Sequence, residues 1–270
     1  MTKNREENGV RGSRKSPVRR MLSYQVANMQ GIGMRERQED AFAFVNAIDV
    51  TEIRTKGLLA MVADGMGGMQ DGKAASEKVS AIIRKDFELY DRERDMTSQL
   101  LDSVYHAGNE VYQIIHGDGG STIVACVFFQ EQLHFCSVGD SFLFLYRDGV
   151  LLRVNHEHNR QSDFYLDAIR EGSMDPTTGR THPEKDALTQ FVGMDGLEEI
   201  DCFQKPLRLK NNDIFLLCSD GVGGVLTDEE IAGCLQGSPA KMCADLEELV
   251  ISKKRPHQDN YTALIIRCGY

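Results

Sequence analysis

Five aspartates of this sequence share a position that could support chemistry, because each stands at one end of an apolar segment. They are Asp40, Asp64, Asp140, Asp220 and Asp259. The clearest case is "LLAMVADGMGG", where six apolar residues, 58–63, run directly into Asp64. If strands that end in aspartate are antiparallel to strands that begin after one, all five carboxylates lie at one edge of the sheets. The spacing therefore predicts a cluster of carboxylates.

A cluster of this kind needs positive charge to be stable. Two carboxylates ~5 Å apart repel each other by ~3 kcal/mol at an effective dielectric constant of ~20. The surrounding segments offer oxygen ligands without cysteine or histidine, and this set suits hard ions such as Mg²⁺ or Mn²⁺. Gly65, Gly67 and Gly68 would let the backbone turn sharply and bring a carbonyl oxygen to a metal.

Two metals at this edge could hydrolyse a phosphoester. Each metal lowers the pKa of bound water, and a bridging hydroxide can then attack phosphorus in line. Arg35, five residues before Asp40, could hold the phosphate oxygens with its two-pronged guanidinium group. Each aspartate taken alone could instead be a turn residue or a helix N-cap, and this alternative is strongest for Asp140 in "SVGDSF". Their joint occurrence in the right strand phase favours the metal site.

The elements that must position these residues are mostly short strands. Runs rich in Val, Ile, Phe and Leu, bounded by turn residues, predict strands at 22–29, 41–48, 57–63, 121–129, 132–138, 141–147, 150–154, 188–193, 200–206, 213–219 and 261–268. Helical periodicity predicts helices at 73–90, 97–115, 160–171, 227–236 and 240–253. The strands within 121–154 follow one another without a helix, which is typical of antiparallel sheets. Residues 155–187 are the most polar internal stretch, and a loop of this length is usually functional or mobile.

Length and composition fit one globular domain. The chain has 270 residues, of which 41% are hydrophobic and 27% are charged. No apolar run reaches the ~18 residues of a membrane span, and the N-terminus shows no secretory signal. The seven cysteines form no CxxC pair and stand mostly in apolar runs. We therefore expect reduced thiols in a cytoplasmic protein without a membrane span.

Charge is distributed unevenly along the chain. The net charge is −10, but residues 1–20 carry +5 and the remainder carries −15. An acidic body argues against nucleic acid as a partner. The basic tail has almost no apolar content, so we expect it to be disordered. It could be a solvated extension, or it could dock to an acidic partner or a membrane surface.

Six motifs occur together in the order seen in one known family. They are "RERQED", "VADGMGG", "GGSTIVACVF", "HFCSVGDSFLFLYRDG", "LLCSDGVGGVLTDEEI" and "QDNYTALII". Over about residues 22–270 the chain resembles the metal-dependent serine/threonine protein phosphatases of type 2C (the PPM family), and it looks most like the compact bacterial type. The resemblance implies an α+β fold, a four-layer αββα sandwich of two antiparallel β-sheets flanked by helices, with a dinuclear metal centre at one edge. It also implies one catalytic domain at 21–270, with a flap at 156–187 beside the active site.

The resemblance implies a role for each motif residue at the metal centre. Asp64 would bridge both metals, and the carbonyl oxygen of Gly65 would bind one of them. Asp220 and Asp259 would complete the shell of the first metal. With Arg35, Asp64 and Asp220 would be the catalytic residues.

Other residues would act around this centre, again by resemblance. Glu39 and Asp40 would hold metal-bound waters, and Asn260 would stand behind the ligands. Arg35 would grip the phosphate. Asp140, together with the position of Asp220, would hold a third and weaker metal.

The implied activity is metal-dependent hydrolysis of phosphoserine and phosphothreonine in proteins, with two Mn²⁺ or Mg²⁺ ions. The partners would be a phosphorylated protein substrate and a cognate serine/threonine kinase or its targets. The alternative is a regulatory pseudophosphatase that acts as a binding module. Retention of Asp64, Gly65, Asp220 and Asp259 together argues against that alternative.

The sequence departs from the family pattern at three points. Met66 stands where animal members carry the histidine proposed as general acid, so the acid is unassigned, although bacterial members commonly have Met there. Phe142 stands where the family usually has Arg after "GDS". Bacterial members are often tethered by a membrane helix, and we expect none here.

Two rival interpretations fit less well. Haloacid-dehalogenase phosphatases also end a strand in aspartate, but they need a second aspartate two residues later, and Val222 stands there. The "HEH" at 156–158 could bind a metal, but no further ligands stand nearby, so a role in the flap is favoured.

Overall fold

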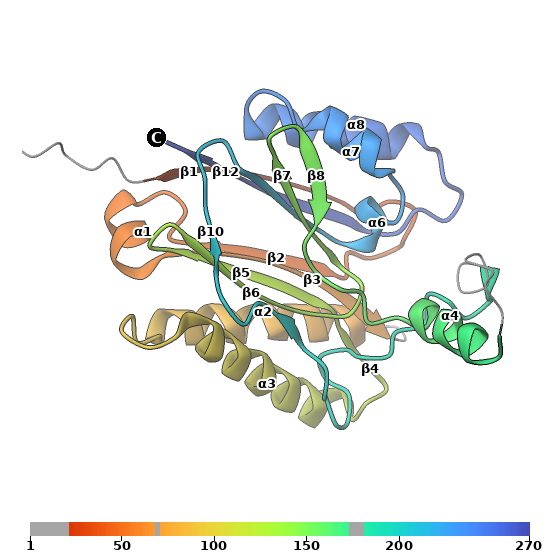
Figure 1. The fold of residues 1–270 in the computed structure, drawn as a ribbon. Helices are drawn as coiled ribbons and strands as arrows, with labels where there is room; N and C mark the ends of the chain where they lie inside the picture. The colour runs from red at the N-terminus through yellow and green to blue at the C-terminus, as the bar shows by residue number, and fades with distance from the viewer. Residues whose placement is uncertain (1–21, 68–70, 173–180) are drawn as a thin grey trace, which may run out of the picture.

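The apolar segments pair into two antiparallel sheets that lie face to face. The structure is a computed structural model that describes residues 22–67, 71–172 and 181–270. Helices cover the outer face of each sheet, which gives the four-layer αββα sandwich that the resemblance implies (Figure 1). The basic tail at 1–20, Gly68 and part of the flap lie outside the described residues.

The first sheet carries the strands that lead to Asp220 and away from Asp259. Its strands, in spatial order, are β1 (Ser23–Gly31), β12 (Tyr261–Gly269), β11 (Ile214–Cys218), β7 (Phe142–Arg147) and β8 (Val150–Arg153). Strand β12 is buried on both faces, because Ile265 packs under the helices while Leu264 and Ile266 face the other sheet. This explains why its sequence reads as a continuous apolar run.

The second sheet carries the strands that hold Asp40 and Asp64. Its path is β10 (Leu207–Arg208), β6 (Gln132–Val138), β5 (Ile123–Phe129), β3 (Leu58–Gly67) and β2 (Asp40–Val45), and two short strands, β4 (Gly119–Ser121) and β9 (Asp201–Cys202), pair with β3 and β6. The sheets meet through an apolar layer in which the rings of Phe128 and Phe215 lie 5.3 Å apart. This layer holds the aspartate-bearing ends of the two sheets together.

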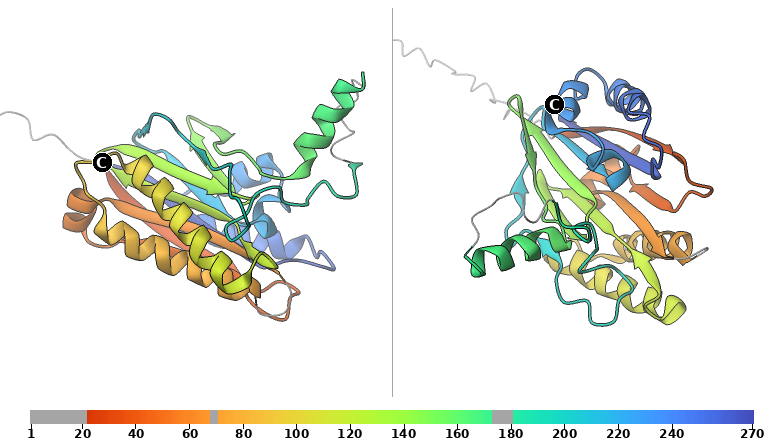
Figure 2. Two further views of the ribbon diagram at one scale, coloured as in Figure 1. Left: turned by 90° about the horizontal axis from the view of Figure 1, so that it is seen from below. Right: turned by 90° about the vertical axis from the view of Figure 1, so that its right-hand side faces the viewer.

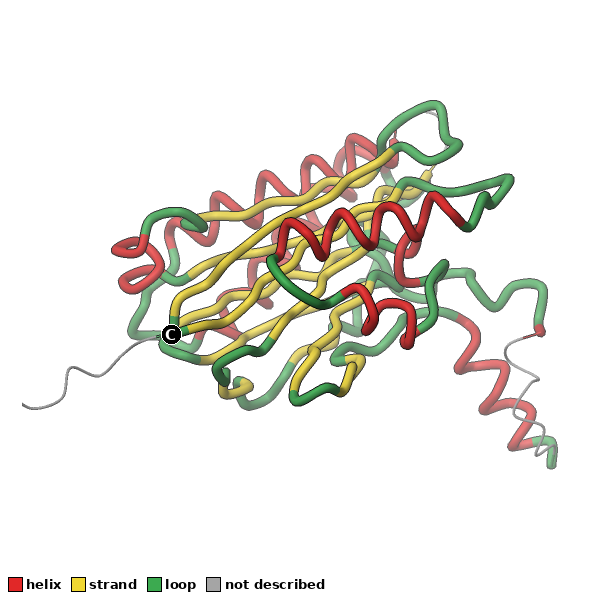
Figure 3. The backbone as a smooth tube through the Cα atoms, turned by 90° about the horizontal axis from the view of Figure 1, so that it is seen from above, coloured by secondary structure: helices red, strands yellow, loops and turns green. Residues whose placement is uncertain are grey.

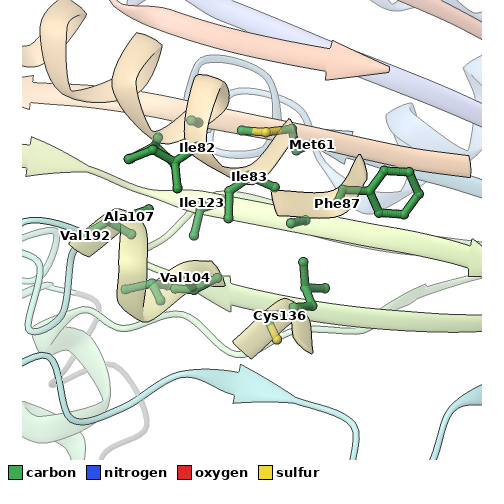
Figure 4. Packing of buried hydrophobic residues seen from close by; sticks show 14 of the residues in the cluster. Met61, Ile82, Ile83, Phe87, Val104, Ala107, Ile123, Cys136 and Val192 are labelled. Atoms are coloured by element: carbon green, nitrogen blue, oxygen red, sulfur yellow. The ribbon is translucent and has the colours of Figure 1, made fainter. Parts of the chain in front are cut away.

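Two long helices, α2 (Asp71–Leu89) and α3 (Met96–Ile115), cover the second sheet side by side (Figures 1 and 2). Figure 4 shows Ile83 and Phe87 of α2 and Val104 of α3 packing against Met61 and its neighbours in the sheet. Burial of this apolar stripe stabilises both helices, since isolated helices of this length are marginal in water.

Helices α7 (Asp228–Cys234) and α8 (Pro239–Ser252) cover the first sheet (Figure 3). The capping box expected at Thr227 and Glu230 is present. Helix α4 (Arg160–Arg170) belongs to the flap and projects away from the sandwich (Figure 2). Within the described residues, no helix is long and apolar enough to cross a bilayer.

Some expectations about individual elements are wrong. Residues 188–193 are not a strand, because their backbone makes only isolated bridges, from Leu188 to Asn159 and from Val192 to Ser121. The strand expected at 200–206 shortens to β9. The strand expected at 41–48 ends at Val45, since Asn46 has a φ of 65° and leaves the extended region.

Two short helices were not expected from the sequence. Helix α1 (Val50–Lys56) is capped by Asp49, whose side chain accepts hydrogen bonds from two backbone N–H groups. Helix α6 (Asp220–Gly223) begins at one of the five aspartates. Seven and four residues are too few to show helical periodicity.

Candidate active site

The pairing of β2 with β3 brings two of the five aspartates face to face. Asp40 is the direct partner of Asp64 in this antiparallel ladder. The strand that holds Asp64 does not end there, as expected, but continues to Gly67. Its neighbour changes at this point, from β5, which it pairs as far as Val62, to β4, which it pairs from Gly65. Asp64 therefore stands at the point where β3 leaves β5 and begins to pair with β4.

The first sheet brings the other aspartates to the same edge. Asp220 follows β11 and Asp259 precedes β12, and these strands are antiparallel with Cys218 opposite Ala263. Asp140 lies in the connection between β6 and β7. Burial raises the pKa of Asp64 well above its usual range, and the charges of Asp40, Asp220, Asp140 and Asp259 raise it further. The predicted cluster is thus formed, and we call these five residues the carboxylate cluster.

The pKa values of Asp40, Asp140 and Asp220 are raised as well. Burial, opposed by hydrogen bonds from Thr262 and Ser219, raises the pKa of Asp40 to about 6. Burial, followed by the charges of Asp220 and Glu157, raises the pKa of Asp140 to about 7. The pKa of Asp220 is also raised, by burial first and by the charge of Asp259 second. Carboxylates held in this way favour either protons or cations close to them.

Two carboxylate oxygens in the cluster are buried without a hydrogen-bond partner in the described part of the chain: Oδ1 of Asp40 and Oδ1 of Asp220. The other oxygen of Asp40 accepts from Thr262 Oγ1 at 2.7 Å and from Ser219 Oγ at 2.8 Å. An orphaned buried carboxylate oxygen is costly unless a cation or water meets it.

These oxygens belong to carboxylates, which are the donors that a hard divalent cation prefers. Among the described residues, however, no three or more His, Cys, Asp or Glu side chains already meet in an arrangement that could hold a metal ion. The fit therefore rests on the donor chemistry and on the orphaned oxygens, rather than on a preformed coordination shell.

A cavity of about 370 Å³ opens beside the carboxylate cluster. Asp140, Asp220 and Asp259 line it together with Lys185 and Asp186 of the flap. Glu157, Asn159 and Gln161, from the start of the segment expected to form a flap, line it too. The start of this segment is anchored by His158, whose backbone N–H donates to Gly139 O at 2.9 Å and whose ring also contacts the Gly139 backbone. This histidine has the structural role in the flap that was favoured over metal binding.

Arg35 lies beside the cluster, but its immediate partner is a carboxylate. Its guanidinium group forms an ion pair with Asp259. The side chain of Arg35 is 54% exposed, so most of the group remains accessible to an incoming anion. Glu39 lies nearby, and its pKa is raised by burial while the charge of Arg35 lowers it.

Asn260 explains how the loop that carries Arg35 and Glu39 is held in place. The Asn260 side chain accepts from Glu39 N at 2.7 Å and donates to Ile32 O at 2.9 Å and Arg37 O at 3.0 Å. It is only 3% exposed. One buried amide therefore ties the loop between β1 and β2 to the start of β12.

The two Asp-Gly pairs of the cluster, Asp64-Gly65 and Asp220-Gly221, each pack the glycine against another backbone. A Cβ atom on Gly65 would lie 2.0 Å from Gly72 O, and one on Gly221 would lie 1.9 Å from Asn260 O. Any larger residue would force the chains apart and move the aspartate before it. From the sequence, we expected the glycines after Asp64 to bring a carbonyl oxygen to a metal. The close contact that the structure shows at Gly65 is with the backbone of Gly72.

Several polar residues of the site were missed in the sequence. Ser219 and Thr262 donate to the carboxylate of Asp40, and Thr122 Oγ1 accepts from the backbone N–H of Asp64. Ser141 hydrogen-bonds Thr122, and Gln258 donates to Gly221 O at 2.9 Å. Ser and Thr in apolar runs are too common to signal a site. A spacing signal existed for three of them: Ser219 stands directly before Asp220, Gln258 directly before Asp259, and Ser141 directly after Asp140.

The departures from the family pattern can now be placed. Phe142 lines the cavity, and the guanidinium carbon of Arg153 lies 3.9 Å from the centre of its ring. Arg153 also lowers the pKa of Asp140, against the larger effect of burial. A cation is therefore present near the position of Phe142, although it comes from β8. Met66 lies in β3, opposite Gly120.

Comparison with known proteins finds relatives among the protein phosphatases. The family model described as "Protein phosphatase 2C" matches residues 34–249. The "Serine/threonine phosphatase stp" of Listeria innocua is 25% identical over 227 residues, which cover 80% of this chain and 87% of that protein. The "Serine/threonine protein phosphatase PstP" of Mycobacterium tuberculosis is 30% identical over 217 residues, which cover 77% of this chain and 40% of that protein.

A solved structure has the same fold. It is described as the catalytic domain of serine threonine protein phosphatase PstP "in complex with 2 Manganese ions". It matches with a TM-score of 0.71 and 23% identity, over 93% of this chain and 100% of that chain.

Proposed function

The chain belongs to the protein phosphatase 2C family and is a protein-serine/threonine phosphatase, and we propose that the carboxylate cluster is its catalytic centre. The observation that carries this proposal is the pair of orphaned buried oxygens, on Asp40 and Asp220, beside Asp64 and the open cavity. The comparisons favour turnover over the pseudophosphatase alternative.

Two Mn²⁺ or Mg²⁺ ions would be held by the carboxylates of Asp64, Asp220 and Asp259 and by the carbonyl oxygen of Gly65. Asp40 and Glu39 would receive the waters around them. The PstP structure in complex with two manganese ions supports this number. Such ions supply positive charge for the phosphate and lower the pKa of water for attack on phosphorus.

Other side chains at the site bind and orient the substrate. Arg35 meets the phosphate oxygens at the mouth of the site. Asn260 holds the loop that carries Arg35 in register with β12. Met66 has no proton to give, so the proton for the leaving oxygen comes from another group or from water.

The direct test is phosphate release from a phosphoserine or phosphothreonine peptide and from para-nitrophenyl phosphate. We expect turnover with added Mn²⁺, and we expect EDTA to abolish it. Turnover that persists in EDTA at full rate would contradict a metal centre, and release from neither substrate would contradict the enzyme assignment.

Arg35→Ala is expected to raise KM for para-nitrophenyl phosphate about tenfold or more, because a hydrogen bond to a charged group is lost. Arg35→Lys should bring KM only part of the way back to the wild-type value, since lysine has no bidentate fork. Arg54→Ala, at an exposed position on α1, is the matched control. A change in the Mn²⁺ requirement with an unchanged KM would show instead that Arg35 serves to orient Asp259.

Asp140→Asn is expected to keep the fold but to need more Mn²⁺ for half-maximal activity. We propose that Asp140 binds a third, weaker metal together with Asp220, and Asn removes the charge that offsets that ion. The raised pKa of Asp140, caused by burial and by the charges of Asp220 and Glu157, supports this over a solvated turn. If the Mn²⁺ titrations of the wild-type protein and the Asp140→Asn variant superimpose, Asp140 is a turn residue, a role that Asn fills equally well.

The wider setting follows from the activity. The substrate is a phosphorylated protein, and we propose that it is a cognate serine/threonine kinase or a target of that kinase. We also propose that residues 21–270 act as one catalytic domain. All seven cysteines are free in the structure, six of them buried, which supports a cytoplasmic setting.

A further inference from the structure

A second cavity, of about 250 Å³, lies on the other side of the Asp259 segment and is mainly apolar. Its apolar lining comes from three elements: Ile32 and Met34 in the loop after β1, Val250 and Ile251 in α8, and Tyr261 at the start of β12. We call these five residues the apolar pocket. Met34 is 68% exposed, Ile251 is 59% exposed and Ile32 is 45% exposed. Exposed apolar side chains gathered around a hollow are typical of a binding site.

This pocket adjoins the cavity beside the carboxylate cluster. Gln258 and Arg255 line both cavities. The backbone of Gln258 accepts from Met34 N at 2.8 Å, and its side chain donates to Gly221 O at 2.9 Å. Met34 is also the residue directly before Arg35. A chain segment that places its phosphate at Arg35 is therefore within reach of the apolar pocket.

The charged residues at the edge of the apolar pocket indicate which kind of chain segment could bind there. Lys254 and Arg255 are exposed and line the pocket, and neither forms an ion pair with any residue that the structure describes. These two cations would repel the basic segment at 1–20, which carries +5. The hollow has room for about one side chain. A stable interface between two copies would bury ~800 Å² of surface on each partner, which is much more than one side chain covers. A segment with an apolar residue and nearby negative charge fits best.

We propose that the apolar pocket is a specificity subsite for the phosphoprotein substrate. It binds one apolar side chain, such as Leu or Met, within a few residues of the phosphorylated Ser or Thr, and Lys254 and Arg255 meet an acidic residue beside it. This inference rests on the proposed function. It adds a sequence preference that the carboxylate cluster alone does not supply.

The test is a panel of phosphothreonine peptides in which one Leu replaces Ser at each position from four residues before to four residues after the phosphothreonine. We expect one or two positions at which Leu raises kcat/KM about tenfold or more, mainly through KM, because burial of one large apolar side chain is worth that factor. Each value is divided by kcat/KM of the same protein for para-nitrophenyl phosphate, so that changes at the metal centre cancel.

Ile251→Ser should reduce this Leu preference severalfold. Leu89→Ser is the matched control, since Leu89 is 76% exposed at the end of α2, on the opposite layer, and its loss should leave the preference intact. Lys254→Glu should exchange a preference for Glu beside the Leu for a preference for Lys. Both substitutions are at exposed positions, and a thermal melt verifies the fold.

The outcomes separate cleanly. No Leu preference in the wild-type protein, or an equal preference in the Ile251→Ser variant, would overturn the subsite while leaving the phosphatase function standing. A dimer that Ile251→Ser dissociates would overturn it in favour of a contact between copies. No turnover of any peptide or of para-nitrophenyl phosphate would overturn the proposed function, and the subsite with it.

Discussion

Asp64→Ala is expected to lower turnover of phosphopeptide and para-nitrophenyl phosphate by on the order of 10³ or more, the scale of losing a central charge-stabilising group. Asp64 is the residue whose carboxyl is close enough to feel the charges of all four other members of the cluster. Its removal would leave the two proposed cations without the ligand they share. The same result is expected for Asp220→Ala, since Asp220 contributes one of the orphaned oxygens.

The measurement is steady-state kinetics over a range of Mn²⁺ concentrations, with circular dichroism to verify the fold. Asp102→Ala is a matched control, because Asp102 is exposed on α3 and alanine suits a helix. Turnover of the Asp64→Ala variant close to that of the wild-type protein would sink the dinuclear interpretation of the carboxylate cluster.

The meeting of the aspartates could be predicted because strand geometry leaves few choices. In an antiparallel pair, a residue at the end of one strand faces the start of the next, so Asp40 and Asp64 had to be neighbours if their strands paired. The apolar runs before Asp64 and Asp220 also gave the strands themselves. What the pattern did not show was that β3 continues past Asp64 and changes its neighbour there.

The details of the site depend on contacts between distant parts of the chain, which have no local signature. The hydroxyl of Thr262 reaches Asp40 across 222 positions, and Asn260 reaches Ile32 across 228. The ion pair between Arg35 and Asp259 is of the same kind. The strand expected at 188–193 does not form for the opposite reason. The local pattern of these residues suits a strand, but they make only two isolated bridges to the rest of the chain.

The carboxylate cluster also predicts how stability depends on pH when cations are removed. In EDTA, the free energy of unfolding is expected to fall as pH rises from about 4, the usual pKa of Asp in an unfolded chain, to about 7. The pKa of Asp40 is raised to about 6 and that of Asp140 to about 7, mainly by burial. Within this window the unfolded chain releases its protons first, so rising pH favours unfolding.

Asp40→Asn should weaken this slope in EDTA, because the amide carries no charge and its oxygen can still accept from Ser219 and Thr262. Urea unfolding at pH 4, 5, 6 and 7 measures the slope, and Asp102→Asn provides the control at an exposed site. A free energy of unfolding that rises with pH in EDTA would mean that the cluster is well solvated or paired, and the fit to cations would lose its physical basis.

Added Mn²⁺ should cancel or reverse this trend, since cations replace protons at the same oxygens. A single site filled at a hundred times its Kd adds about 2.7 kcal/mol to the free energy of unfolding. For a domain of this size that amounts to a rise in Tm of about 5 to 10 °C at pH 7. The rise should shrink at pH 5, where protons compete, and it should shrink in Asp64→Ala at every pH. An equal Mn²⁺ effect in Asp64→Ala and in the wild-type protein would place the ion elsewhere, because the carboxylate cluster cannot lose its central member and keep its affinity.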